Sequence, residues 1–202
     1  MCLRYGNHMG LQVKNMRHTP SFACRNRRRE NRGMTAIELL AAISVALILS
    51  AMAVPAITSV VGGLRIAGDA QGLANQMQLA KLRAGSDFTH TRLFISTDTN
   101  SYSVQLFNAG AFATEGGNIK LSSGVTFGLG TVGVPAGTQA ALAQTTKIEF
   151  NSRGIPVNAA GAPTGADAVY LTNQQGQSYA VSVNASGQIK VWRYTGAAWK
   201  AI

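Results

Sequence analysis

The stretch that decides the fold reads Arg32-Gly33-Met34-Thr35-Ala36-Ile37-Glu38-Leu39-Leu40. It opens an apolar run, MTAIELLAAISVALILSAMAVPAITSVV, over residues 34–61. Glu38 is the one charged residue among these 28. A helix needs about 20 mostly apolar residues to cross a bilayer, so the run predicts a membrane-spanning helix. An ionisable group at membrane depth is costly and usually functional, which singles out Glu38.

The segment before this run is strongly basic. Residues 1–33 hold eight Lys or Arg against one acid, so they carry +7 of the chain's net +10. They show no apolar periodicity and are expected to be an unstructured leader, whether it starts at Met1, Met9 or Met16. Basic residues beside a spanning helix stay in the cytoplasm, so the rest of the chain is expected across the membrane.

Two other interpretations of the apolar run remain open. A cleaved secretory signal peptide has an apolar region of about 7–15 residues and a small-residue cleavage site, and this run is longer. An ordinary signal anchor would explain the hydrophobicity and the flanking charge. Neither of these two interpretations explains an acid at Glu38.

The helical period continues beyond the run as one apolar stripe, while charged and amide residues such as Gln76 fall on other faces. Pro55 and the pair Gly62-Gly63 are expected to bend this helix rather than end it. Helical from Met34 to about Asp87, it would span ~80 Å at 1.5 Å per residue. The stripe is formed by Ile66, Ala70, Leu73, Met77, Ala80, Ala84 and Phe88.

From Thr91 onward the pattern indicates strands separated by Gly and Asn turns. Strands are predicted over residues 92–97, 102–107, 119–121, 125–129, 147–150, 168–172, 179–184 and 188–194, with loops over 108–118, 130–145 and 155–166. The expected fold is α+β: a long N-terminal helix, first membrane anchor and then amphipathic, packed on a small antiparallel sheet. The expected parts are a leader (1–33), an anchor helix (34–61) and a domain on the far side of the membrane (62–202).

The junction resembles the type IV prepilin signature: a basic leader ending in Gly, then an apolar helix with Glu as its fifth residue. The resemblance implies cleavage between Gly33 and Met34 by a prepilin peptidase, and N-methylation of the new amino terminus at Met34. The family usually has Phe at that position. Glu38 is then the assembly residue, a carboxylate that pairs with the free amino terminus of a neighbouring subunit as the anchor enters a filament.

The C-terminal half is similar to the GspH/FimT group of minor pilins and pseudopilins. The similarity rests on a strand ending in Phe150 and followed by Asn-Ser-Arg-Gly154, and on a last hairpin that turns at Gly187 into a basic strand. Some members bind DNA through a Gly-Arg-x-Arg stretch in that hairpin. Here Gln188 and Lys190 replace the two arginines, so Lys190, Arg193 and Lys200 are candidate DNA contacts, with Trp192, Tyr194 and Trp199 nearby.

An enzyme is not expected. Both cysteines, Cys2 and Cys24, lie in the leader, and His90 is the one histidine after residue 33, at a helix-to-strand junction. No His/Cys cluster has metal-ligand spacing, no Gly-x-Ser-x-Gly occurs, and no cofactor is implied. A dinucleotide-type spelling at residues 128–133 is followed by loop rather than helix, and a glycosylation sequon at Asn184 falls in a predicted turn.

The sequence therefore predicts a minor pilin-like subunit of a type II secretion pseudopilus or a type IV pilus, acting in protein secretion or pilus biogenesis. Its expected place is the bacterial inner membrane, single-pass, with the N-terminus cytoplasmic and the C-terminal domain periplasmic. Expected partners are the prepilin peptidase and other pilins or pseudopilins. The alternative is a DNA-binding minor pilin acting in DNA uptake, whose binding would weaken steeply with salt.

Overall fold

The computed structural model describes residues 33–202, so the leader predicted before Gly33 lies outside the described residues. The chain divides into two compact units, Met1–Ser44 and Val45–Ile202. One helix, α1 (Ala36–Ser86), carries residues of both units, and all the strands belong to the second.

Helix α1 begins at Ala36, two residues after the expected start at Met34, and runs on for 51 residues. Thr35 precedes it as the N-cap, and its hydroxyl oxygen accepts a hydrogen bond from the Glu38 backbone N–H at 3.3 Å. The helix continues through Pro55 and Gly62-Gly63 and ends within one residue of the expected position. Gly62 lies against Gln175, whose Oε1 would be 2.5 Å from a Cβ added at Gly62. The Gly62 carbonyl also accepts a bond from Asn173 Nδ2 at 3.4 Å, at the end of β7.

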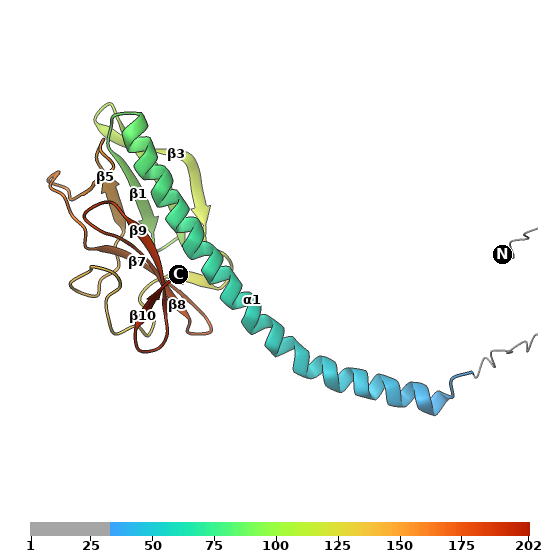
Figure 1. Ribbon diagram of the computed structural model, residues 1–202. Coiled ribbons are helices and arrows are strands. Elements are labelled where there is room, and N and C mark those ends of the chain that lie inside the picture. The colour runs from blue at the N-terminus through green and yellow to red at the C-terminus, as the bar shows by residue number, and fades with distance from the viewer. Residues whose placement is uncertain (1–32) are drawn as a thin grey trace, which may run out of the picture. The chain divides into compact units, whose positions relative to one another are not determined.

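The fold class is confirmed as α+β, but the strands form two antiparallel sheets rather than one small sheet (Figure 1). Sheet A has the order β3-β2-β1-β5-β6, and sheet B has the order β10-β9-β8-β7-β4. The strands are β1 (Thr91–Ser96), β2 (Ser101–Asn108), β3 (Ala111–Lys120), β4 (Val125–Phe127), β5 (Lys147–Phe150), β6 (Pro156–Val157), β7 (Asp167–Asn173), β8 (Ser178–Val183), β9 (Ile189–Tyr194) and β10 (Trp199–Ala201).

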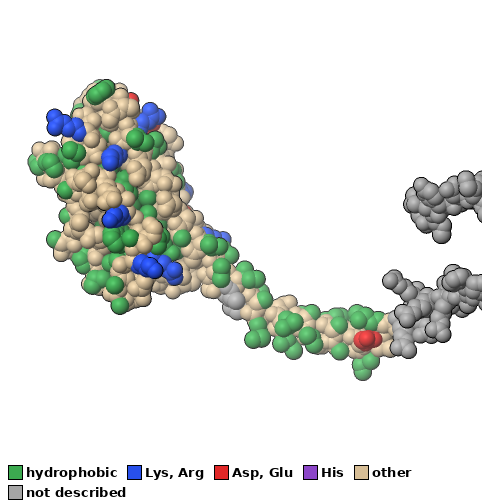
Figure 2. Space-filling view, viewed as in Figure 1, with side chains coloured by type: hydrophobic (Ala, Val, Ile, Leu, Met, Phe, Trp, Pro, Cys, Tyr) green, Lys and Arg blue, Asp and Glu red, His purple; other side chains and the backbone are tan. Residues whose placement is uncertain are grey.

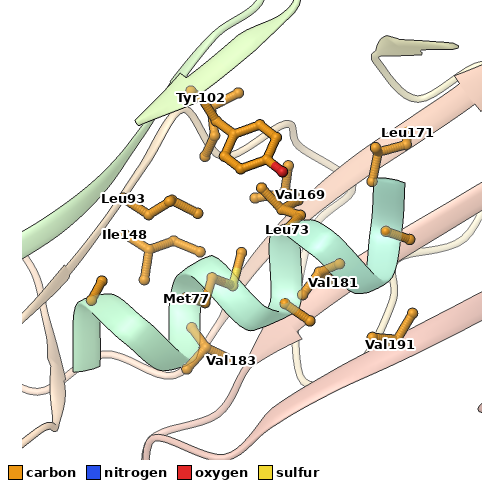
Figure 3. Close-up of a cluster of buried hydrophobic side chains, with 14 of the residues drawn as sticks. Leu73, Met77, Leu93, Tyr102, Ile148, Val169, Leu171, Val181, Val183 and Val191 are labelled. Carbon is orange, nitrogen blue, oxygen red and sulfur yellow. The ribbon is translucent and has the colours of Figure 1, made fainter. Parts of the chain in front are cut away.

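The apolar stripe of α1 packs against both sheets at once. Its residues from Ile66 to Ala84 are fully buried, in one cluster with side chains of sheet A and sheet B. Figure 3 shows Met77 of α1 between Leu93 of β1 and Val183 of β8. Apolar residues spaced three or four apart predict a helix that buries one stripe. The packing of α1 on the sheets is therefore confirmed from Ile66 onward.

Two helix residues differ from expectation. Phe88 is not part of the buried stripe: α1 ends at Ser86, and the Phe88 side chain is 85% exposed. The chain turns left-handed at Phe88, where φ is +50°. The Thr89 N–H donates to the Ala84 carbonyl at 3.3 Å and closes the end of the helix. Gln76 is half-buried rather than on a fully exposed face, since β3 passes beside it.

Four segments differ from the predicted strands and loops. The region predicted as loop over 108–118 is mostly strand β3, because left-handed Ala109 and Gly110 close a tight hairpin that returns the chain along β2. The predicted strand at 119–121 is the end of β3, beyond a bulge at Gly116-Gly117. The expected loop at 155–166 contains β6, which pairs with β5, and β10 was not predicted at all.

The face of sheet B opposite α1 is covered by the loop over residues 128–146. The loop predicted over 130–145 is confirmed, but the strand predicted over 125–129 ends at Phe127. Tyr170 is central to this contact: its fully buried hydroxyl accepts from the Ala136 N–H at 2.9 Å and donates to the Gln139 side-chain oxygen. Burial raises the pKa of the Tyr170 hydroxyl above its usual 10.0, partly offset by the bond from Ala136.

One turn type recurs four times, with the spelling Asn-x-x-Gly. In each, the Asn side-chain oxygen accepts backbone N–H bonds from the residues two and four positions on, and the Gly takes a positive φ of 70–78°. These turns begin at Asn151, Asn158, Asn173 and Asn184. Two of them end at Gly154 and Gly187, the glycines of the GspH/FimT-like pattern.

Candidate functional site

Glu38 lies in the first turn of α1 and is exposed. Its carboxylate has no partner among the described residues, although its backbone N–H is capped by Thr35. A carboxylate in the first helical turn is favourable toward the helix dipole by about 0.3–1 kcal/mol. That local role does not fix the side chain in place, so the carboxylate is free to pair with a group from outside this chain.

Gly33 and Met34 precede the helix and are both exposed. A Cβ added at Gly33 would meet nothing within 4 Å, and Gly33 does not take one of the positive φ values that favour glycine. The described structure therefore gives no steric or conformational reason for glycine at this position. A glycine that the fold does not require is consistent with recognition of this position by another protein.

The surface of α1 changes character along its length. From Ile37 to Leu64 its large apolar side chains are exposed on every side, whereas from Ile66 one stripe is fully buried. Within the described residues, α1 is the helix long and apolar enough to cross a membrane. Figure 2 shows hydrophobic side chains along the exposed part. Apolar surface on this scale in a stable protein marks contact with a membrane or another protein.

The three candidate DNA contacts do not lie on one face. Arg193 of β9 and Lys200 of β10 are direct cross-strand partners, and both are exposed. Side chains alternate along a strand, so Lys190, three residues before Arg193, points to the opposite face of sheet B. The structure thus brings Arg193 and Lys200 together and separates Lys190 from them.

The aromatic residues near these cations pack on the protein itself. Trp192 Nε1 donates to Ser182 Oγ at 2.8 Å, and Trp199 Nε1 donates to the Val134 carbonyl at 2.9 Å. Tyr194 packs on Trp199 with ring centroids 5.1 Å apart. All three lie on the face of Lys190, which the 128–146 loop covers, rather than beside Arg193 and Lys200.

Lys81 lies outside the apolar stripe of α1 but is half-buried. Its Nζ donates to the Gly187 carbonyl at 3.0 Å, and its aliphatic stem lies against Gly154. A Cβ at Gly187 would be 2.6 Å from the Gly154 carbonyl oxygen. The two pattern glycines therefore allow one turn from each sheet to meet over Lys81, and they are explained by the fold.

Other polar side chains among the described residues are paired with groups of the same chain. His90 Nδ1 lies 2.8 Å from Glu149 Oε1 at the junction before β1. Arg83 forms an ion pair of 2.8 Å with Glu115. Asp69 accepts bonds of 2.9 Å from both the N–H and the hydroxyl of Ser122. In residues 33–202 no group of three or more His, Cys, Asp or Glu could hold a metal ion.

No protein-family model matches the sequence, and no curated protein matches it. Among solved structures, the chain is similar to the minor pseudopilin EpsH of the type 2 secretion system of Vibrio cholerae. That match has 12% identity and a TM-score of 0.46, and it covers 63% of this chain and 95% of EpsH. A second EpsH structure matches with 15% identity and a TM-score of 0.44, covering 65% and 94%.

The chain is also similar to the type IV minor pilin FimU of Pseudomonas aeruginosa, with 12% identity and a TM-score of 0.44. That match covers 67% of this chain and 92% of FimU. Identity and TM-score are low in all three matches.

Proposed function

We propose that this chain is a minor subunit of a pilin-like filament, either a type II secretion pseudopilus or a type IV pilus. The observation that carries the proposal is the change of surface along α1. One continuous helix is apolar on all sides from Ile37 to Leu64 and then buries a single stripe from Ile66. The first part of such a helix needs apolar surroundings from outside the chain, whereas the stripe of the second part packs on the sheets of the same chain.

Before assembly, the bilayer is the environment that fits the first part. The 28 residues from Met34 to Val61 exceed the roughly 20 needed to cross the hydrocarbon core. The net charge of +7 on residues 1–33 would keep the N-terminus in the cytoplasm. The two sheets would then lie in the periplasm of a bacterium, and residues 34–61 would anchor them to the inner membrane.

Processing at the start of the helix follows from the same proposal. A prepilin peptidase would cleave between Gly33 and Met34, and the new amino group of Met34 would be methylated. Support comes from Gly33, which is exposed and which neither sterics nor φ requires to be glycine. Cleavage there leaves Glu38 four residues from a free amino terminus, at the very start of α1.

In the filament, neighbouring anchor helices would replace lipid around one another. Glu38 would then be a carboxylate among apolar side chains, where an unpaired charge is strongly unfavourable. The free amino terminus of a neighbouring subunit is the cation that would pair with it. This pairing needs a carboxylate that its own chain leaves unpartnered, as that of Glu38 is among the described residues.

The test compares Glu38→Ala with Ser50→Ala in the full chain. Ser50 is polar and lies in the same apolar segment, but its hydroxyl is bonded to the Ala46 carbonyl of its own helix at 2.7 Å. Both variants should insert into the membrane. We expect Ser50→Ala to co-purify with filament or tip subunits and Glu38→Ala to lose them. Equal co-purification of the two variants would refute the assembly role of Glu38.

A second candidate function, DNA binding during uptake, is favoured by one observation. Arg193 and Lys200 are exposed cross-strand neighbours, and the described residues offer neither of them an acidic partner. Two adjacent cations on paired strands at the edge of sheet B suit contact with successive phosphates. This candidate keeps the same anchor and processing and differs only in what the periplasmic part binds.

A further inference from the structure

The two ends of sheet B meet different levels of α1. A Cβ added at Gly63 would be 3.1 Å from Gln177 Oε1, which follows the turn between β7 and β8. At the other end of the sheet, Lys81 Nζ donates to the Gly187 carbonyl in the turn between β8 and β9. From Gly63 to Lys81 the helix rises roughly 27 Å at 1.5 Å per residue. One end of sheet B therefore lies where the exposed apolar segment of α1 stops.

This end of sheet B carries two exposed cations and no acid. Arg193 of β9 is the cross-strand partner of Tyr179, near the start of β8, and of Lys200 in β10. Both cations therefore lie at the end of the sheet beside Gly63 rather than at the opposite end. Asp167 is the last acid in the chain, so β8, β9 and β10 supply no carboxylate to neutralise them.

Arg193 also lines a groove between α1 and sheet B. The groove has a volume of about 380 Å³, within the range of about 300–1,000 Å³ that is usual for small-molecule sites. Val60 and Leu64 form part of its helix wall, and Gln177 lies beside Arg193 on the sheet wall. Val60 and Leu64 are 62% and 68% exposed. The groove thus combines exposed apolar side chains with a cation.

A third cation lies on another side of α1 at about the same level. Arg65 is exposed and lines a separate hollow, where its guanidinium donates to the Ser123 carbonyl at 3.5 Å. Asp69, one turn farther along α1, already accepts two bonds from Ser122. Asp98 is exposed but lies in the turn between β1 and β2 of sheet A. Figure 2 shows Lys and Arg side chains at the end of the domain from which α1 emerges.

We propose that this end of sheet B binds the headgroup phosphates of anionic phospholipids while α1 is anchored in a membrane. The groove is continuous with the exposed apolar segment of α1, which itself needs lipid around it. When the side chains up to Leu64 lie among acyl chains, Arg65 and Arg193 lie at the level of the phosphates, where long cationic side chains are favoured. The inference rests on the proposed membrane anchor and adds a lipid class and an orientation of the domain.

The apolar part of the groove favours lipid over nucleic acid as the occupant. Acyl chains would cover Val60 and Leu64, whereas a phosphate backbone would leave them in water. The aromatic side chains of the last hairpin pack on the protein itself and are not presented for stacking on bases. The contact holds the domain against the bilayer and is released when α1 leaves the bilayer during assembly.

Fluorescence quenching in vesicles tests the contact with the full chain. In a background with Cys2→Ser and Cys24→Ser, Ala197→Cys carries a fluorophore at an exposed position in the turn between β9 and β10. The vesicles contain phosphatidylcholine, alone or mixed with phosphatidylglycerol, and lipids that carry a nitroxide quencher on the headgroup. We expect strong quenching with phosphatidylglycerol, weak quenching with phosphatidylcholine alone, and loss of the difference at high salt.

Matched variants connect the quenching to the proposed residues. Arg193→Gln with Lys200→Gln should lower the ratio of membrane-bound to free domain by about fivefold for each cation removed. Lys190→Gln makes the same charge change on the opposite face of β9 and should leave quenching unchanged. A fluorophore at Ala185→Cys, in the turn at the far end of sheet B, should not be quenched in either lipid mixture. Equal quenching at Ala197 in the two mixtures, or an equal loss with Lys190→Gln, would overturn the inference.

A further probe separates failure of this inference from failure of the proposed anchor. A fluorophore at Ala51→Cys, in the exposed apolar segment, should be quenched in both mixtures by lipids with a nitroxide on the acyl chain. If Ala51 is quenched and Ala197 is not, the lipid contact is refuted and the anchor stands. If Ala51 is not quenched, the anchor is refuted as well. If Arg193→Gln with Lys200→Gln weakens DNA binding and leaves the quenching unchanged, this face binds nucleic acid and the inference is wrong.

Discussion

Met77→Ala in a fragment that starts at Gly63 tests whether the second part of α1 forms the core of the periplasmic unit. Met77 is fully buried among residues of both sheets (Figure 3). The fragment omits most of the exposed apolar segment and keeps the whole buried stripe from Ile66. We expect it to fold alone, without a metal or a disulfide.

The magnitude follows from the burial. Replacing a fully buried Met by Ala costs about 2–5 kcal/mol, because transfer energy is lost and a cavity remains between sheets that cannot close around it. A domain of this size has a net stability of about 5–15 kcal/mol. Its midpoint shifts by roughly 2–4 °C per kcal/mol, so Met77→Ala should lower the melting temperature by about 5–20 °C. Met77→Asp, which buries a carboxylate in the same place, should abolish folding.

Thermal unfolding followed by circular dichroism measures the effect. Gln78→Ala is the matched control, because Gln78 is the next residue on the helix and is exposed. Its free energy of unfolding should change by less than about 0.5 kcal/mol. If Met77→Ala and Gln78→Ala melt at the same temperature, the stripe is not core and our assignment of the helix to the two sheets is wrong.

Four further outcomes are expected. Gly33→Arg should leave an uncleaved precursor in the membrane, seen as a larger band on a blot, while the fold after Ala36 is unaffected; normal processing would count against the peptidase. Tyr170→Phe should lose stability, because the Ala136 N–H is left without its acceptor at a cost of about 1–3 kcal/mol. Burial raises the pKa of Tyr170 above 10.0, so above pH 10 the unfolded chain ionises this hydroxyl while the folded chain keeps it protonated. The wild-type chain should therefore lose stability above pH 10 and Tyr170→Phe should lose less; identical alkaline melts would contradict this. If the chain binds DNA, Arg193→Ala with Lys200→Ala should weaken binding and reduce its salt dependence, whereas Lys190→Ala alone should not, in mobility-shift titrations.

The helix could be predicted from sequence because its two signals are local. The apolar run from Met34 and the spacing from Ile66 to Ala84 are read directly from residue order, and both match the structure. Phe88 fits the same spacing but lies beyond the last helical residue. Spacing alone does not show where a helix ends, and the left-handed turn at this position uses no glycine to signal it.

The sheets were harder to predict because pairing decides them. The segment from Ala111 to Lys120 is rich in Gly, Ala and Thr and has no strand-like alternation, yet it forms β3 by pairing with β2. β10 has three residues and exists through its pairing with β9. The Asn-x-x-Gly spelling at four turns was a usable signal, and it correctly marks where strands in both sheets end.

The candidate site could be predicted only in part. Gly33, Met34 and Glu38 can be found from the sequence alone. The change from a basic to an apolar segment and the single acid within the apolar run are both visible in residue order. The relation of Lys190 to Arg193 and Lys200 depends on strand alternation and on the unexpected β10. The contact of Lys81 with the turns at Gly154 and Gly187 joins three segments distant in sequence, so only the folded chain shows it.

The measurement that tests the central claim most directly is the intact mass of the full chain purified from bacteria that carry a prepilin peptidase. We expect a mature chain that begins at Met34, carries one added methyl group at its amino terminus and retains Glu38 and the whole of α1. A chain that begins at Met1, Met9 or Met16 would show that no prepilin processing occurs. A chain cut after the apolar run would identify residues 34–61 as a secretory signal, and either result would contradict the filament-subunit account.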